Sequence, residues 1–122
     1  MGMLKQQIRR IWLRTRWSWE GLVHVWHTEH SLKQWIVAYA VSVVLALILP
    51  ITAGEKALLL MGGVLVFAFE CLNTAIERTV DRISMERHPL AKQAKDTASA
   101  AVALSAIALG LAWAVILIGL AL

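Results

Sequence analysis

The chain has 122 residues, of which 59% are hydrophobic, and a formal net charge of +4. This size and composition suit a single membrane domain over residues 1–122 and exclude a separate soluble domain. The basic residues lie beside apolar segments, which favours a membrane surface over nucleic acid as their partner, and no glycine-rich phosphate loop is present.

Residues 3–29 are predicted to form an amphipathic helix. Their apolar residues recur every three to four positions, from Leu4 and Ile8 to Leu22 and Trp26, with basic residues between them. This pattern indicates a helix that lies on the membrane, with its tryptophans at the level of the phospholipid headgroups.

Three later segments are apolar and long enough to cross a membrane: residues 32–51, 55–81 and 98–122. Each approaches the ~20 residues that span a ~30 Å hydrocarbon core, and only a helix satisfies its own backbone polar groups there. The first segment is expected to end at Pro50, with Gly54 in the turn that follows. The sequence therefore predicts an all-α integral membrane protein with three transmembrane helices plus an N-terminal amphipathic surface helix.

The distribution of Lys and Arg predicts the orientation. Six of these residues precede or begin the first span, one lies in the connection over residues 52–56, and five lie in the connection over residues 78–95. Since cytoplasmic loops carry the excess of positive charge, we expect the N-terminus and the second connection to be cytoplasmic and the C-terminus to be outside.

Polar side chains interrupt the second span on one helix face. Glu70, Asn73, Glu77 and Asp81 follow one another at steps of three and four residues, which places them within an arc of roughly 80°. A carboxylate at the bilayer centre costs on the order of 3 kcal/mol and normally faces a functional site or a partner. A simple membrane anchor would not need this row.

These residues alone leave three classes of function open. An enzyme would use the row as a catalytic site. A small multidrug or proton-coupled transporter would also use an intramembrane glutamate, but it would not need the cytoplasmic pair Lys95–Asp96. A structural or regulatory membrane protein would need none of these polar side chains.

The row belongs to a longer pattern. The run E-C-L-N-T-A-I-E-R-T-V-D at residues 70–81, followed by A-K-Q-A-K-D at residues 91–96, resembles the prokaryotic diacylglycerol kinase family, which includes undecaprenol kinases. The resemblance covers nearly the whole chain. It implies an enzyme of the bacterial inner membrane that transfers the γ-phosphate of ATP to diacylglycerol, giving phosphatidic acid. It also implies a homotrimer whose composite sites are built from neighbouring subunits, whereas the small-residue face of the third span supports only an oligomer.

The resemblance also implies roles for individual residues. Glu70 is the expected general base, Glu29 and Glu77 are the expected Mg²⁺ ligands, and Asn73 and Asp81 support them. The expected ATP-binding residues are Arg10, Trp17, Glu29, Glu77, Glu86, Arg87, His88, Lys95 and Asp96. The expected residues for binding the lipid substrate are Arg10, Glu70 and Ser99.

The identity of the lipid rests on mixed signals. Diacylglycerol kinases typically carry an acidic residue after the glutamine that matches Gln34, and here Trp35 stands in that place, closer to the undecaprenol kinases. In contrast, the segments around residues 18–22, 81–83 and 99–102 resemble the diacylglycerol branch. We therefore predict a diacylglycerol kinase, with undecaprenol kinase as the alternative.

Overall fold

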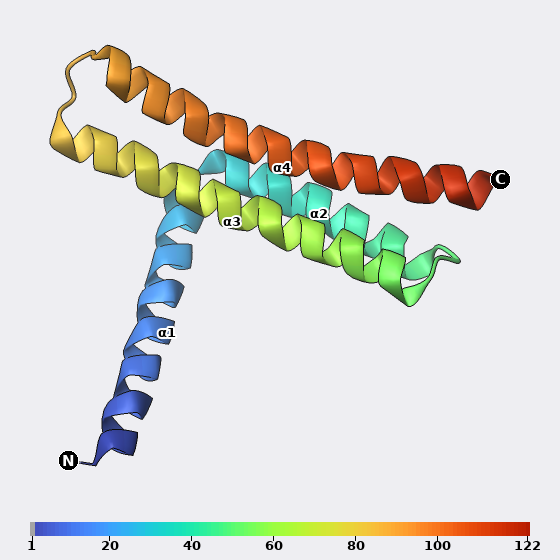
Figure 1. The fold of residues 1–122 in the computed structure, drawn as a ribbon, viewed down its shortest axis with the longest axis horizontal. Helices are drawn as coiled ribbons and strands as arrows, with labels where there is room; N and C mark the ends of the chain where they lie inside the picture. Colours follow the sequence, from blue (N-terminus) through green and yellow to red (C-terminus); the bar gives the residue numbers. More distant parts are fainter. Residues whose placement is uncertain (1) are drawn as a thin grey trace.

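A computed structural model describes residues 2–122, which form four helices. They are α1 (Met3–Thr28), α2 (His30–Ile48), α3 (Ala53–Ile83) and α4 (Pro89–Ala121). Figure 1 shows α2, α3 and α4 running alongside one another, and α1 leaving this bundle at a steep angle. The described residues contain no strand, so the predicted all-α class is confirmed.

Three of the helices, α2, α3 and α4, are long and apolar enough to cross a membrane, as predicted. The 19 residues of α2 correspond to ~28 Å, close to the thickness of the hydrocarbon core. The 31 residues of α3 and the 33 of α4 correspond to ~46–50 Å, so these two helices exceed that thickness by ~15–20 Å.

The helix boundaries differ from the predicted spans at several ends. The first span ends at Ile48, because Pro50 disfavours the helical conformation at Leu49, whose ψ is 145°. Gly54 does not lie in a turn as predicted, because α3 already begins at Ala53. The cause is a capping box at the start of this helix. The Thr52 hydroxyl accepts the backbone N–H of Glu55, and the Glu55 carboxylate accepts the backbone N–H of Thr52.

The last helix begins nine residues before the predicted third span. His88 caps its N-terminus by accepting the backbone N–H of Leu90 at 3.1 Å, and Pro89 occupies the first helical position. Hydropathy marks only the apolar part of such a helix, so the polar first turns that carry Lys95 and Asp96 were predicted to lie in a connection.

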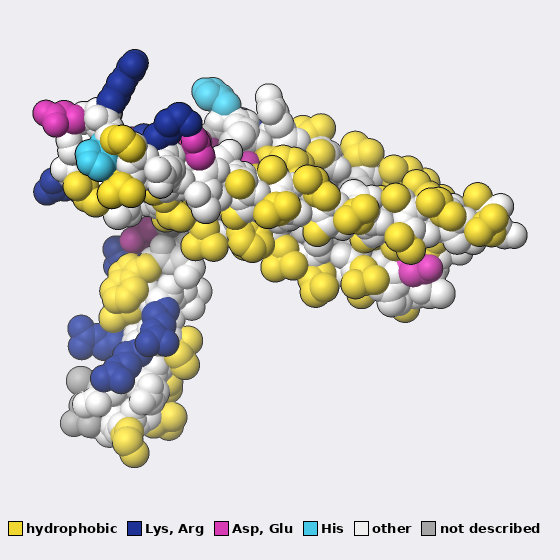
Figure 2. Space-filling view, turned by 45° about the horizontal axis from the view of Figure 1, so that its top comes forward, with side chains coloured by type: hydrophobic (Ala, Val, Ile, Leu, Met, Phe, Trp, Pro, Cys, Tyr) yellow, Lys and Arg dark blue, Asp and Glu magenta, His cyan; other side chains and the backbone are white. Residues whose placement is uncertain are grey.

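The core of the bundle lies between α2, α3 and α4. Ala46, Leu59 and Ile116 form a buried cluster, against which Leu109 and Trp113 pack. Most other large apolar side chains are exposed on the outside of the bundle. Figure 2 shows hydrophobic side chains covering the bundle, whereas charged side chains gather mainly along α1 and at the end that carries the α3–α4 connection. This distribution fits a lipid-embedded bundle with one polar end.

Gly63 is the glycine whose replacement should cost the most stability. A Cβ atom at this position would lie 2.1 Å from two ring carbons of Tyr39, and that ring is fixed by its hydroxyl, which donates to the carbonyl of Leu60 at 3.0 Å. Gly63→Ala is therefore expected to destabilise the protein by about 1–3 kcal/mol through overpacking. The melting temperature in detergent would measure this, with Gly110→Ala as control, since a Cβ there meets nothing within 4 Å. Equal melting temperatures for the two variants would contradict the prediction.

Candidate functional site

The polar row of α3 begins with a buried carboxylate. Only 7% of Glu70 is exposed, and its Oε1 accepts a hydrogen bond of 2.6 Å from Nε1 of Trp35 on α2. Because α2 and α3 pack side by side, a residue 35 positions earlier reaches the row. No described residue donates to Oε2, which leaves this oxygen available to accept a proton.

One helical turn further along α3, Asn73 and Glu77 contact each other. The amide Nδ2 of Asn73 donates to Oε1 of Glu77 at 3.3 Å. The carbonyl Oδ1 of Asn73 is buried and has no hydrogen-bond partner among the described residues. A buried acceptor without a donor is uncommon and suggests a ligand or ion at this place.

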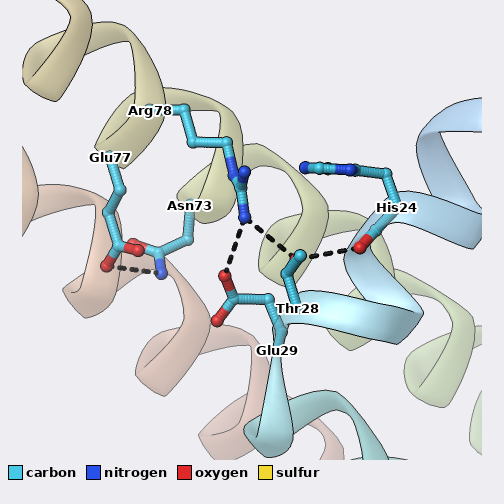
Figure 3. Close-up of polar contacts among 6 residues, drawn as sticks. All are labelled: His24, Thr28, Glu29, Asn73, Glu77 and Arg78. Carbon is cyan, nitrogen blue, oxygen red and sulfur yellow. Dashed lines mark hydrogen bonds and ion pairs between the residues drawn. The ribbon is translucent and has the colours of Figure 1, made fainter.

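Glu29 reaches the same region from a different element. It is the single extended residue between α1 and α2, and its Oε1 lies 3.6 Å from Nη2 of Arg78 on α3. Nη2 of Arg78 also donates to the hydroxyl of Thr28 at 2.9 Å. Figure 3 shows the carboxylate of Glu29 turned toward Arg78, whereas that of Glu77 is turned toward Asn73. Glu29 therefore reaches α3 through Arg78, the residue that directly follows Glu77.

These oxygen atoms suit a hard divalent cation. Within residues 2–122, no three His, Cys, Asp or Glu side chains gather closely enough to hold a metal by themselves. Mg²⁺, however, usually takes only one or two carboxylates and completes its shell with phosphate oxygens and water. Glu29, Glu77 and the unpartnered Oδ1 of Asn73 fit that requirement.

Removing Arg78 should loosen the C-terminal end of α1 with little effect on overall stability. The pair with Glu29 is partly exposed, and such pairs are worth about 0–1 kcal/mol. In Arg78→Ala, amide hydrogen exchange over residues 25–29 should therefore become faster while the melting temperature changes little. Arg16→Ala is the matched control, because Arg16 pairs with Glu20 inside α1 only. Unchanged exchange over these residues in Arg78→Ala would contradict this prediction.

A cavity of about 680 Å³ lies at the polar end of the bundle, where the α3–α4 connection joins the two helices. Across it, Nζ of Lys95 lies 2.6 Å from Oδ1 of Asp81, which links α4 to α3. Asp96 pairs with Lys92, one turn earlier on α4. The lining contains Asp81, Glu86, Arg87, His88, Lys95 and Asp96. Most of the predicted ATP-binding set therefore meets at one cavity.

Three predicted site residues lie elsewhere. Arg10 and Trp17 are exposed on α1, which projects from the bundle, and neither lines the cavity. Ser99 is exposed on α4, four residues beyond Lys95 and so on the same helix face. Within one chain, Arg10 and Trp17 are not brought together with the α3 row.

Two contacts of the site were missed by the sequence analysis. Trp35 was considered only as a marker of lipid type, and Arg78 only as a basic loop residue. Their partners lie 35 and 49 or more residues away in the chain, and helical periodicity relates only residues on the same helix. No local signal therefore predicts either contact.

The chain matches known proteins over most of its length. The model of the family described as "Prokaryotic diacylglycerol kinase" matches residues 16–117. A protein of Pseudomonas aeruginosa named diacylglycerol kinase is 38% identical over 112 residues, which cover 92% of this chain and 91% of the relative. Its namesake in Escherichia coli K12 is 41% identical over 101 residues, 83% of each chain. That of Haemophilus influenzae is 35% identical and covers 84% of this chain.

Proposed function

Because the chain belongs to the prokaryotic diacylglycerol kinase family and is a membrane lipid kinase, we propose that the polar row of α3 is its phosphoryl-transfer site. The observation that carries this proposal is the buried Glu70, which lies beside the linked pair Asn73 and Glu77 within a lipid-embedded helix. A charged row of this kind is costly in lipid and needs a function there.

The lipid substrate is diacylglycerol, and the product is phosphatidic acid. The relatives from Pseudomonas aeruginosa, Escherichia coli and Haemophilus influenzae are all named diacylglycerol kinases. The alternative, undecaprenol, is not favoured by these relatives. Trp35 therefore departs from the acidic residue typical of diacylglycerol kinases without changing the assignment of the lipid.

Glu70 acts as the general base. Its carboxylate is held by Trp35 through Oε1, and Oε2 takes the proton of the lipid hydroxyl as the hydroxyl oxygen attacks the γ-phosphorus of ATP. The bond between this phosphorus and the bridging oxygen breaks, and ADP leaves. The main task of the site is to position the lipid hydroxyl and the γ-phosphate, since catalysis of phosphoryl transfer depends chiefly on orientation and charge neutralisation.

Glu29 and Glu77 would hold Mg²⁺, and the unpartnered Oδ1 of Asn73 would be a further oxygen ligand. When bound, Mg²⁺ neutralises the charge of the phosphate oxygens. The ion pair between Glu29 and Arg78 keeps Glu29 beside α3, next to the residue that follows Glu77.

ATP occupies the cavity at the polar end of the bundle. Its volume of about 680 Å³ lies within the ~300–1,000 Å³ that small-molecule sites usually have. Lys95 is a point charge for the β- or γ-phosphate, and Asp81 keeps it at the cavity. Glu86, Arg87, His88 and Asp96 also line this cavity. Ser99, one turn beyond Lys95 on α4, is the proposed contact for the lipid.

The working unit is a homotrimer. Arg10 and Trp17 are exposed on a helix that projects from its own bundle, and a neighbouring subunit offers a site that such a helix reaches. The many exposed apolar side chains along α3 and α4 provide surface for contacts between subunits as well as with lipid. The N-terminus and the α3–α4 connection are cytoplasmic, where ATP is present, and the C-terminus is outside.

Phosphate transfer to defined lipids tests this function. The purified protein in mixed micelles receives Mg²⁺ and labelled ATP, with diacylglycerol and undecaprenol offered in parallel. We expect transfer to diacylglycerol to be the faster reaction. A preference for undecaprenol would reverse the lipid assignment, and transfer to neither by a folded protein would contradict the kinase.

A further inference from the structure

The shortest link between α2 and the polar row of α3 is a single hydrogen bond. Nε1 of Trp35 donates to Oε1 of Glu70 at 2.6 Å, and the acceptor side chain is only 7% exposed. The indole itself is half-buried and forms part of the wall of a cavity of about 230 Å³ between α2, α3 and α4. No second described residue donates to this carboxylate.

This bond determines where the carboxylate points. A glutamate side chain has three rotatable bonds, and a general base has to keep its oxygen within about 2.6–3.2 Å of the proton that it removes. A hydrogen bond to a charged acceptor is roughly twice as strong as one between neutral groups. Because Oε1 is engaged by the indole, Oε2 is the oxygen that remains for the reaction.

We propose that Trp35 is a positioning residue of the phosphoryl-transfer site, whose indole N–H orients the carboxylate of Glu70 toward the lipid hydroxyl. This inference rests on the proposed function of Glu70 as the base. It goes beyond that function because it assigns the orientation of the base to a side chain of α2. It also gives Trp35 a role that depends on its N–H group and not on its apolar ring.

Another tryptophan provides a matched control. Nε1 of Trp113 on α4 donates to the hydroxyl of Ser42 on α2 at 2.9 Å, and this indole lines the same cavity as Trp35. Both side chains are partly buried and link two apolar helices. They differ in the acceptor, since only Trp35 reaches a carboxylate of the polar row. Replacing either by phenylalanine removes an indole N–H from the same part of the bundle.

The experiment compares kcat and KM in Trp35→Phe, Trp113→Phe and the wild type. We expect Trp35→Phe to lower kcat by about 10–100-fold, as a small misplacement of a reacting group does, with KM for MgATP unchanged. Trp113→Phe should leave both constants near those of the wild type. Trp35→Gln, which restores an N–H donor without the ring, should recover part of the lost kcat. An unchanged kcat in Trp35→Phe, or equal losses in both phenylalanine variants, would overturn the proposal.

A double-mutant cycle tests the contact without catalysis. Trp35→Phe should lower the melting temperature less in a Glu70→Leu background than in the wild type, because that background already lacks the hydrogen bond between the two side chains. Equal losses in both backgrounds would overturn the contact. If the wild type is active and Trp35→Phe has the same kcat, only the positioning role of Trp35 is refuted. If the folded wild type has no lipid kinase activity, the proposed function is refuted, and this inference with it.

Discussion

Replacing Glu70 with glutamine is expected to lower the turnover of lipid phosphorylation by about 10²–10⁴-fold, the contribution typical of a general base. Glutamine is nearly isosteric and keeps a side-chain oxygen that accepts the N–H of Trp35, so the bundle should stay folded. It cannot take a proton from the lipid hydroxyl. MgATP binding, measured by equilibrium titration, should remain close to that of the wild type because the cavity proposed for ATP lies at the end of α3 and the start of α4.

Glu20→Gln is the control for this experiment. Glu20 is an exposed carboxylate on α1 whose partner is Arg16, so its loss removes one negative charge outside the polar row. We expect its turnover to match that of the wild type. Retained turnover in Glu70→Gln would instead show that another group accepts the proton.

Glu29→Gln and Glu77→Gln are expected to raise the Mg²⁺ concentration needed for half-maximal activity by about 10–100-fold, and to weaken MgATP binding with it. Each variant removes one of the charged oxygens proposed to bind the metal and leaves Glu70, the proposed base, intact. A Mg²⁺ titration of activity at saturating lipid measures the shift. The two variants should therefore differ from Glu70→Gln, which loses turnover but still binds MgATP.

The ion pair between Glu29 and Arg78 requires its own control. Glu29→Gln weakens this pair as well as the metal site, and Arg78→Met removes the pair while both carboxylates remain. If the Mg²⁺ requirement rises in Glu29→Gln but not in Arg78→Met, the effect belongs to the metal. An equal rise of the Mg²⁺ requirement in both variants would assign the effect to the placement of α1. An unchanged Mg²⁺ requirement in Glu77→Gln would contradict the role of Glu77 as a metal ligand.

Much of the fold follows from sequence periodicity. The apolar lengths predict three spans, and the alternation of apolar and basic residues predicts α1, because both features are local. Local signals also explain two of the boundaries that were misplaced. The threonine and glutamate at positions 52 and 55 form a recognisable capping box, and Pro89 marks the first turn of α4. The predicted spans were based on hydropathy alone, which takes neither the capping box nor the proline into account.

The site could be predicted only in part. The spacing of Glu70, Asn73 and Glu77 places them on one face of a single helix, and the structure has them there. Contacts between helices, such as that of Trp35 with Glu70, depend on how α2 and α3 are aligned. Helical periodicity relates only residues on the same helix, so it does not predict this alignment. Arg10 and Trp17 lie on a helix that projects from its own bundle, so only the resemblance, and not the spacing of residues in the sequence, assigns them to a site.

The extended residue between α1 and α2 has a mechanical consequence. Val25 is the only buried residue of α1, so packing restrains this helix weakly. Its direction depends on the backbone of Glu29, with φ −109° and ψ 110°, and on the contacts of Thr28 and Glu29 with Arg78. The same backbone atoms carry the carboxylate that faces Arg78. A different tilt of α1 would therefore change the direction of the Glu29 side chain as well. The direction of α1 and the contact between Glu29 and Arg78 are in this way coupled through one residue.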